Sequence, residues 1–192
     1  MKDSLWSVDL FRCKSITLNS FWVMVVLDQY TRRIIGFSVR KGDCDGIAYC
    51  RVFNRIVAEK LPPIYLSSDN DPLFEFHRWK AKLRILEIDE IKSIPGTPQS
   101  HPFIERVIGS TRREFLDHVL FFNERDLTKK LNLFQEYYNE TRGHSSLGMK
   151  TPREKAAADK TSKKVVSLDE YRWTSHSTGL SSITPCHCSC EW

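Results

Sequence analysis

The sequence predicts a mixed α/β fold in which helices flank a sheet. Three observations indicate this class. Apolar segments rich in β-branched and aromatic residues open the chain, segments with helical spacing dominate its second half, and short strand-like runs lie between helical stretches. This alternation is typical of a layered α/β domain, and 192 residues suffice for one such domain with a short appendage.

The first three strands are expected at Leu5 to Phe11, Phe21 to Leu27 and Ile34 to Val39. The polar connectors CKSITLNS and DQYTRR separate them, and short polar connectors favour hairpins. We therefore predict an antiparallel meander of three strands, which later strands extend into a mixed sheet.

The next segment alternates helices and strands. Asp45 should cap a helix over Gly46 to Lys60, which a pair of prolines ends. A short buried strand at Ile64 to Leu66 follows, and then a helix from Pro72 to Lys82. Apolar residues between Leu86 and Ile94 supply the last strand.

The second half is helical up to a change in composition. The loop PGTPQSHP precedes a long helix from Pro102, and Leu127 to Tyr138 repeats apolar residues at helical spacing. Beyond Ala158, Ser and Thr dominate and large aliphatic residues are few. We therefore predict a catalytic-size core at 1–158 and a tail at 159–192 that is extended or partly disordered.

Composition excludes few functions. The net charge of +5 suits a polyanionic partner but also occurs in many proteins that bind no nucleic acid. The apolar run at Phe21 to Leu27 is much shorter than the roughly 20 residues of a membrane-spanning helix, so we expect no membrane partner. The first residues lack the pattern of a secretory signal, and the six cysteines lack the spacing of a disulfide framework, so we expect an intracellular protein with reduced thiols.

Three carboxylates lie at positions that ask for an explanation. Asp9 falls inside the first predicted strand, Asp69 follows the fourth, and Glu105 lies in the first turn of the long helix. A carboxylate in an apolar strand is costly unless it is paired, hydrogen-bonded or bound to a cation. Three carboxylates brought together would repel one another unless a divalent cation neutralised them, and oxygen ligands suit Mg²⁺ or Mn²⁺.

These residues resemble the DDE triad of the retroviral-integrase and insertion-sequence transposase superfamily, with 35 residues between Asp69 and Glu105. The segments WSVDLF, VVLDQYTRRIIGFSV, YLSSDNDPLF, HPFIERVIGSTRREFLD and YYNETRGHSSLGMKTPREK resemble successive landmarks of an integrase catalytic core. The resemblance covers residues 4–158. It implies a ribonuclease-H-like fold in which two Asp residues stand on adjacent strands and the Glu reaches in from a helix.

The resemblance also implies an activity, which is metal-dependent DNA cleavage and strand transfer during DNA transposition. Two divalent cations, Mg²⁺ or Mn²⁺, about 4 Å apart would flank the phosphodiester. Asp9 would bridge both ions, Asp69 would bind one and Glu105 the other. The implied partners are the element ends, the target DNA and further copies of the chain in a homodimer or larger synaptic assembly, at the nucleoid in the cytoplasm.

Basic residues near the triad are candidates for phosphate contacts. Arg112 lies seven residues after Glu105 and so on the same helical face, while other basic residues lie beside it or farther along the chain. The predicted DNA-binding residues are Arg106, Arg112, Arg113, Lys129 and Lys130. No base specificity follows from them.

Other polar residues have competing explanations. Asp28 is expected to begin the turn after the second strand. Asp71 either caps the next helix or serves as a further metal ligand. His101, four residues before Glu105, is a candidate at the site mouth, whereas Cys186 to Cys190 lack the spacing of a zinc site. Trp79 either packs in the core or stacks on bases.

Two other functions remain open from the sequence. One is a catalytically silent transposase remnant that binds DNA or pairs with an intact transposase, and the other is a ribonuclease-H-like nuclease without strand transfer. Full transposases of this group carry a helix-turn-helix region before the core, and Met1 lies eight residues before Asp9, so we expect specific end recognition to be missing.

Overall fold

The computed structural model of the chain describes residues 2–42, 45–58, 60–69, 72–92, 102–161, 171–175 and 181–185. The chain divides into two compact units, Met1–Asp159 and Lys160–Trp192. The first unit carries the sheet and all the predicted site residues, and each unit is described by itself.

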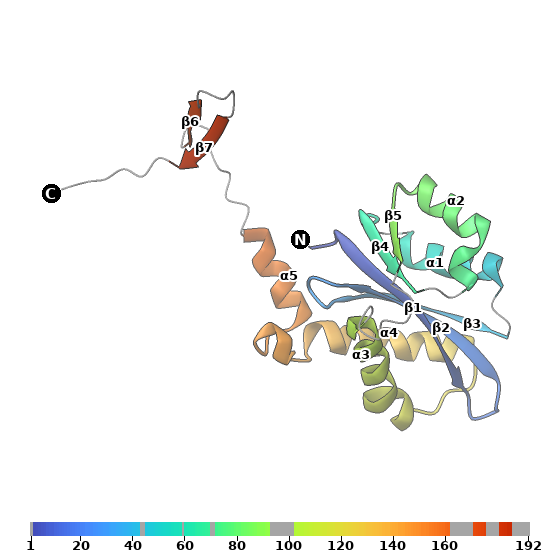
Figure 1. Cartoon of the computed structure of the whole chain (residues 1–192). Coiled ribbons are helices and arrows are strands. Elements are labelled where there is room, and N and C mark those ends of the chain that lie inside the picture. Colours follow the sequence, from blue (N-terminus) through green and yellow to red (C-terminus); the bar gives the residue numbers. More distant parts are fainter. Residues whose placement is uncertain are drawn as a thin grey trace. The chain divides into compact units, whose positions relative to one another are not determined.

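The described residues of the first unit form a five-stranded sheet of order β3-β2-β1-β4-β5 (Figure 1). The strands are β1 (Leu5–Lys14), β2 (Ser20–Asp28), β3 (Ile34–Lys41), β4 (Tyr65–Ser68) and β5 (Asp89–Lys92). The first three pair antiparallel, β4 lies parallel to β1, and β5 lies parallel to β4. The predicted meander and the predicted mixed sheet are confirmed.

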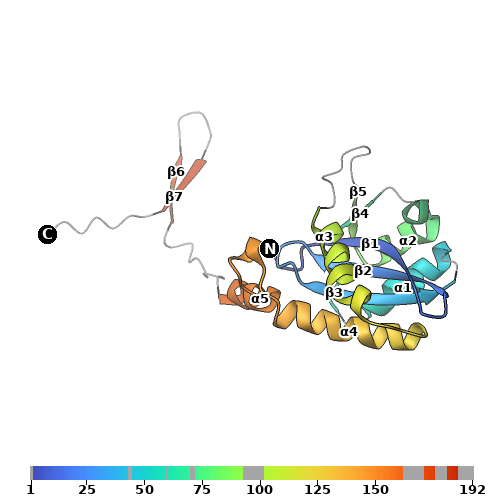
Figure 2. The ribbon, with the colours of Figure 1, turned by 90° about the horizontal axis from the view of Figure 1, so that it is seen from below.

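Helices cover both faces of this sheet. Helices α1 and α2 lie on one face and α3 and α4 on the other (Figures 1 and 2). The helical segments are α1 (Gly46–Val57), η1 (Pro72–Glu75), α2 (His77–Ile85), α3 (Pro102–Ser110), the π-helical η2 (Thr111–Phe115), η3 (Leu116–His118), α4 (Glu124–Glu140), η4 (Ser145–Leu147) and α5 (Pro152–Thr161). Asp45 caps α1 as predicted, since its side chain accepts a hydrogen bond from the amide of Ala48.

Strand β2 explains the continuous apolar run of the sequence. Its side chains alternate between two cores: Met24 and Val26 pack beneath α1 and α2, whereas Val23, Val25 and Leu27 pack beneath α3 and α4. A strand covered on both faces has no solvent side and therefore needs apolar residues at every position.

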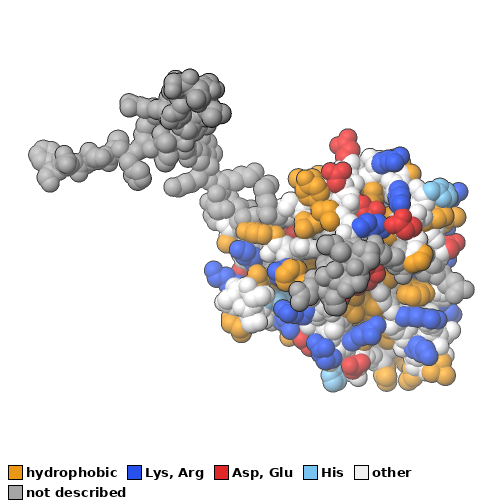
Figure 3. All heavy atoms as spheres, viewed as in Figure 1, with side chains coloured by type: hydrophobic (Ala, Val, Ile, Leu, Met, Phe, Trp, Pro, Cys, Tyr) orange, Lys and Arg blue, Asp and Glu red, His pale blue; other side chains and the backbone are white. Residues whose placement is uncertain are grey.

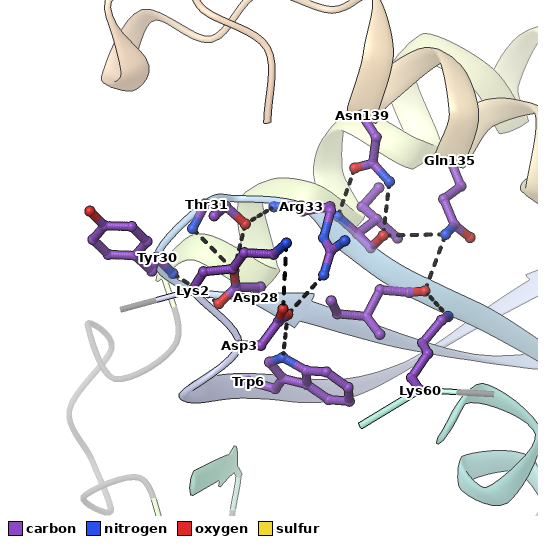
Figure 4. A network of polar contacts seen from close by, with 12 residues as sticks. Lys2, Asp3, Trp6, Asp28, Tyr30, Thr31, Arg33, Lys60, Gln135 and Asn139 are labelled. Carbon is purple, nitrogen blue, oxygen red and sulfur yellow. Dashed lines mark hydrogen bonds and ion pairs between the residues drawn. The ribbon is translucent and has the colours of Figure 1, made fainter. Parts of the chain in front are cut away.

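Side chains from α4 make hydrogen bonds to backbone groups at the outer edge of β3 (Figure 4). Asn139 accepts a hydrogen bond from the amide of Ile34 and donates one to its carbonyl, while Gln135 donates to the carbonyls of Ile34 and Ile35. The other edge strand, β5, reads DEIK, and charged side chains discourage edge-to-edge pairing. The two edges of the sheet are thus protected in different ways.

Two predicted elements differ from the structure. The helix expected over Pro72 to Lys82 is broken at Phe76, which has an extended backbone and separates η1 from α2. The ring of Phe76 packs so closely on Gly46 that there is no room for a Cβ at that position. This contact with α1 is between segments far apart in sequence, so helical periodicity does not reveal it.

The predicted buried strand at Ile64 to Leu66 is also partly wrong. Strand β4 begins at Tyr65 and continues to Ser68, and Ile64 and Tyr65 are 55% and 42% exposed. Leu66 and the two serines are buried instead. The hydroxyl of Ser68 donates a hydrogen bond to Glu90 on the neighbouring strand β5, which compensates its burial.

The second unit contains the strands β6 (Tyr171–Ser175) and β7 (Ser181–Pro185), which pair antiparallel. Along the sequence, α5 is the last helix among the residues that the structure describes. None of the helices in the described part of the chain has the length and apolarity that a membrane crossing needs.

Candidate active site

The register of β1 against β4 aligns two of the three candidate carboxylates. The strands pair in parallel with Leu5 opposite Tyr65 and Ser7 opposite Ser67. The same register continued by two residues sets Asp9 opposite Asp69. Paired residues on neighbouring strands point to the same face, with strands about 4.8 Å apart.

Side-chain alternation shows which face this is. In β1, Trp6 and Val8 pack beneath α1 and α2, whereas Phe11 packs beneath α3 and α4. Asp9 alternates with Val8 and therefore shares the face of Phe11. In β4, Leu66 packs beneath α1 and α2, so Asp69, three residues on, lies on the α3 face as well. Both Asp9 and Asp69 are half-buried.

Helix α3 runs along the same face and carries Glu105. Near its start, the guanidinium carbon of Arg32 lies 3.1 Å from the ring centroid of Phe103. Beyond its end, the guanidinium carbon of Arg112 lies 5.5 Å from the ring centroid of Phe11. Glu105 lies between these two cation–ring contacts along the chain, and its side chain is exposed.

The three carboxylates are not gathered into one coordination group. Within the described ranges, no three His, Cys, Asp or Glu side chains are close enough to hold a metal ion together. Asp9 accepts a hydrogen bond of 2.6 Å from the amide of Leu10. The donor chemistry nevertheless fits a hard cation, because Mg²⁺ and Mn²⁺ bind carboxylate oxygens.

A polar network that sequence inspection missed surrounds the end of β4. The ammonium of Lys92 lies 3.4 Å from the carbonyl oxygen of Asp69 and 3.2 Å from a carboxylate oxygen of Glu90. The same Glu90 oxygen accepts hydrogen bonds from Ser68 at 2.7 Å and from the indole of Trp79 at 3.0 Å. The signal in the sequence is the charged pair within the short strand DEIK.

The predicted DNA-binding residues fall on three elements, α3, η2 and α4. Arg112 is exposed and donates to the carbonyl of Arg12 at 3.5 Å, while Lys130 is paired with Asp126 at 2.9 Å. The remaining three predicted residues are exposed, two on the α3–η2 segment and one on α4: Arg106, Arg113 and Lys129. On the face of the core in Figure 3, Lys and Arg side chains are interspersed with Asp and Glu.

A second polar cluster, also missed, joins the end of α4 to η2. Arg142 donates two hydrogen bonds to Glu114, at 2.8 and 2.7 Å, and lies over the ring of Tyr138. The hydrogen bonds from Arg142 hold the pKa of Glu114 below its usual range. Burial, and then the charge of Arg142, lower the pKa of His144, whose ring packs edge-on against Tyr138. We call these four residues the clasp.

The structure decides between the alternative roles of two polar or aromatic residues. Asp28 is fully buried and accepts hydrogen bonds from the hydroxyl and amide of Thr31, so its predicted turn role is confirmed. Trp79 is fully buried among aromatic rings and belongs to the core, not to a base-stacking surface. The other candidates lie outside the described residues: Asp71, His101 and Cys186 to Cys190.

Comparisons with known proteins agree with this architecture. Residues 87–152 match a family model described as an integrase core domain. The chain is 26% identical over 161 residues to the insertion element IS476 uncharacterized 39.2 kDa protein of Xanthomonas euvesicatoria, covering 84% of this chain and 46% of that protein. It is 23% identical over 137 residues to the transposase for insertion sequence element IS904 of Lactococcus lactis, covering 70% and 54%. The chain thus spans about half the length of these relatives.

Among solved structures, the fold resembles the HTLV-2 integrase catalytic core domain in complex with magnesium, in its dimeric form. The TM-score is 0.61 at 16% identity, and the match covers 80% of this chain and 95% of that one. The mixed sheet and its helices are therefore those of the ribonuclease-H-like integrase core. The chain is thus similar in sequence to proteins of two insertion elements, over residues 87–152 to the integrase core domain family, and in fold to a retroviral integrase core.

Proposed function

We propose that this core cleaves DNA and transfers strands in a metal-dependent reaction, with Asp9, Asp69 and Glu105 as the catalytic carboxylates. The observation that supports this most directly is the parallel pairing of β1 with β4, with Ser7 opposite Ser67. The same register continued by two residues would bring Asp9, in β1, beside Asp69, which directly follows β4. Helix α3, which carries Glu105, covers the same face. Two acids at matching positions would repel each other in the absence of a cation, which is a cost that a metal site explains.

Divalent cations, Mg²⁺ or Mn²⁺, are the proposed cofactors. When bound, two such ions would activate the attacking oxygen and stabilise the leaving oxygen of the phosphodiester. Asp9 and Asp69 would hold them from the sheet, and Glu105 would complete the set from α3. The HTLV-2 integrase core, which shares the fold, is in complex with magnesium.

The proposed partners are element-end DNA, target DNA and a second copy of the chain. Arg112 is proposed as a phosphate contact, which is supported by the position of its guanidinium over Phe11 on the strand that carries Asp9. The residues Arg106, Arg113, Lys129 and Lys130 are proposed as further phosphate contacts. Assembly into a dimer or a larger synaptic complex would allow two DNA ends to be processed together.

A strand-transfer and reverse-joining assay on a preformed branched DNA tests the proposal, since such a substrate needs no end recognition. We expect joined product from the wild type in Mn²⁺ or Mg²⁺ and none after chelation or in Asp69→Asn. The matched control is Asp89→Asn, an exposed acid that pairs with Tyr65 at the opposite end of β4. Equal product from the wild type and Asp69→Asn would contradict the proposal.

The second candidate function is a catalytically silent remnant that binds DNA or pairs with an intact transposase. The observation that favours it is that no three potential ligands in the described ranges are close enough to hold a metal ion. A folded wild type that binds DNA in a salt-dependent manner, and yields no product with either metal, would support this candidate. Cleavage without joined product would instead indicate a nuclease that lacks strand transfer.

A further inference from the structure

We propose that Lys92 is a positioning residue for Asp69, which it holds by the main chain from the side of the sheet opposite Asp9. The inference rests on the proposed function, because it assigns a role in metal binding to a residue that would touch neither metal nor DNA. In this proposal, the short edge strand β5 positions a candidate metal ligand in addition to completing the sheet.

Lys92 links Asp69, which directly follows β4, to η1. Its ammonium lies 3.4 Å from the carbonyl oxygen of Asp69 and 3.3 Å from the carbonyl oxygen of Phe74. It also lies 5.3 Å from the centre of the Phe74 ring. One side chain thus links the backbone that carries the candidate ligand to the backbone that leads into α2.

The direction of approach matters for the chemistry. Lys92 pairs with Ser68 in the β4–β5 ladder, and paired residues lie on the same face. Ser68 and Trp79 belong to the face beneath α1 and α2. Lys92 therefore reaches the carbonyl of Asp69 from that face, opposite the one that carries Asp9. A cation placed there supports the strand end without occupying the face on which Asp9 and α3 lie.

Two acids hold the ammonium in this position. Carboxylate oxygens of Glu90 and Glu75 each lie 3.2 Å from it. The side chain of Glu90 is only 14% exposed, and its bonded oxygen also serves Ser68 and Trp79. Since the carboxylate of Glu90 is largely removed from water, its ion pair with Lys92 favours the position of the ammonium beside Asp69.

The result is that β5 fixes Ser68, the last residue of β4, and Asp69 directly after it. Glu90 binds the side chain of Ser68, and Lys92 binds the carbonyl of Asp69. Groups that orient a metal ligand without touching the metal typically change metal affinity by about 10- to 100-fold when they are removed. Lys92 should therefore affect how tightly the site holds a cation more than how fast the loaded site reacts.

The test compares Lys92→Met, Lys92→Arg and Asp69→Asn in the full chain, with Mn²⁺ as the probe. Electron paramagnetic resonance of free Mn²⁺ measures binding without DNA, and the branched-DNA assay measures product against Mn²⁺ concentration. We expect Lys92→Met to weaken Mn²⁺ binding and raise the activation midpoint about tenfold, with the rate at saturating Mn²⁺ largely kept. Lys92→Arg should restore most of the affinity because it keeps the charge.

The matched control is Lys80→Met, which removes the other cation that pairs with Glu75 and lies in α2. It should leave Mn²⁺ binding unchanged. If Lys92→Met destabilises the fold through the uncompensated Glu90, the double variant Glu90→Gln with Lys92→Met removes that charge and is expected to show the same weakened binding.

The outcomes separate this inference from the proposed function. Unchanged Mn²⁺ affinity in Lys92→Met or in the double variant, with only a lower melting temperature, would make Lys92 purely structural and overturn the inference. Equal Mn²⁺ binding by the wild type and Asp69→Asn would overturn the proposed site itself, and the role of Lys92 with it. Weakened binding in Lys92→Met and Asp69→Asn, but not in Lys80→Met, would support both.

Discussion

At the scale of single residues, Asp28 illustrates how a buried acid can serve structure alone. It is the last residue of β2 and is fully buried. Its carboxylate accepts hydrogen bonds from the hydroxyl of Thr31 at 2.5 Å and from the amides of Tyr30 and Thr31. These donors all belong to the β2–β3 turn, so the charge is satisfied locally and organises that turn.

We predict that Asp28→Ala lowers the free energy of unfolding by about 2–3 kcal/mol, because the buried donors of Thr31 lose a charged acceptor. Urea denaturation measures the change. Asp28→Asn keeps one acceptor oxygen and should cost about half as much. A loss of under about 0.5 kcal/mol in Asp28→Ala would show that the turn does not depend on this carboxylate.

At the scale of elements, the clasp connects α4 to the helical segment that carries Glu105. Arg142 follows the C-terminal end of α4, and Glu114 lies in the π-helical η2 that continues α3. Their two hydrogen bonds, together with the packing of His144 on Tyr138, tie the end of this segment to the core. π-Helical turns often occur at functional sites, and here one presents Glu114 to its partner.

The clasp predicts a pH dependence of stability. The pKa of Glu114 is lowered in the folded state, first by hydrogen bonds from Arg142. Its contribution is therefore fully present above the ordinary glutamate pKa of 4.5 and is lost as the pH falls through the lower folded value. Because the pair is partly exposed, we expect only about 0.5–1 kcal/mol.

The measurement is the unfolding free energy of the wild type and Glu114→Gln between pH 3 and pH 7. The difference between the two proteins should be largest near neutral pH and shrink towards pH 3. Subtraction removes most of the separate effect of His144, whose lowered pKa makes the fold lose stability as the pH drops below 6.5. A difference that stays constant with pH would refute the ion-pair account.

At the scale of the whole molecule, the two faces of the sheet have different roles. The core beneath α1 and α2 contains the packed rings of Tyr49, Phe53, Phe74 and Trp79. The other face carries Asp9 and is crossed by α3, with basic side chains nearby. The proposed chemistry therefore belongs to one face, and the aromatic core supports that face from behind.

This arrangement predicts the salt dependence of DNA binding. If Arg112 neutralises one phosphate, Arg112→Gln should reduce the slope of log affinity against log salt by about 0.9. Fluorescence anisotropy with a duplex at several salt concentrations measures the slope. The control is Arg153→Gln. Arg153 lies in α5, and its guanidinium is already paired with Glu140 on α4, so its loss should leave the slope unchanged. An identical slope in the wild type and Arg112→Gln would remove Arg112 from the DNA interface.

Much of this molecule follows from local patterns in its sequence. Several features depend only on residues within a few positions of one another. They are the three-strand meander, the cap at Asp45, the helix α4 and the position of Asp69 directly after a strand. Backbone preferences and the periodicity of burial act at this range, so the sequence by itself determined the elements, their order and the residue types available for chemistry.

The tertiary structure alone decided which distant residues meet. Three contacts join positions that are well separated in the chain: the parallel pairing of β1 with β4, the contact of Lys92 with Asp69, and the pairing of Arg142 with Glu114. Phe76, where the predicted helix is broken, likewise contacts the distant Gly46. Such contacts depend on the packing of whole elements, in which long-range burial outweighs the weak preferences of each segment.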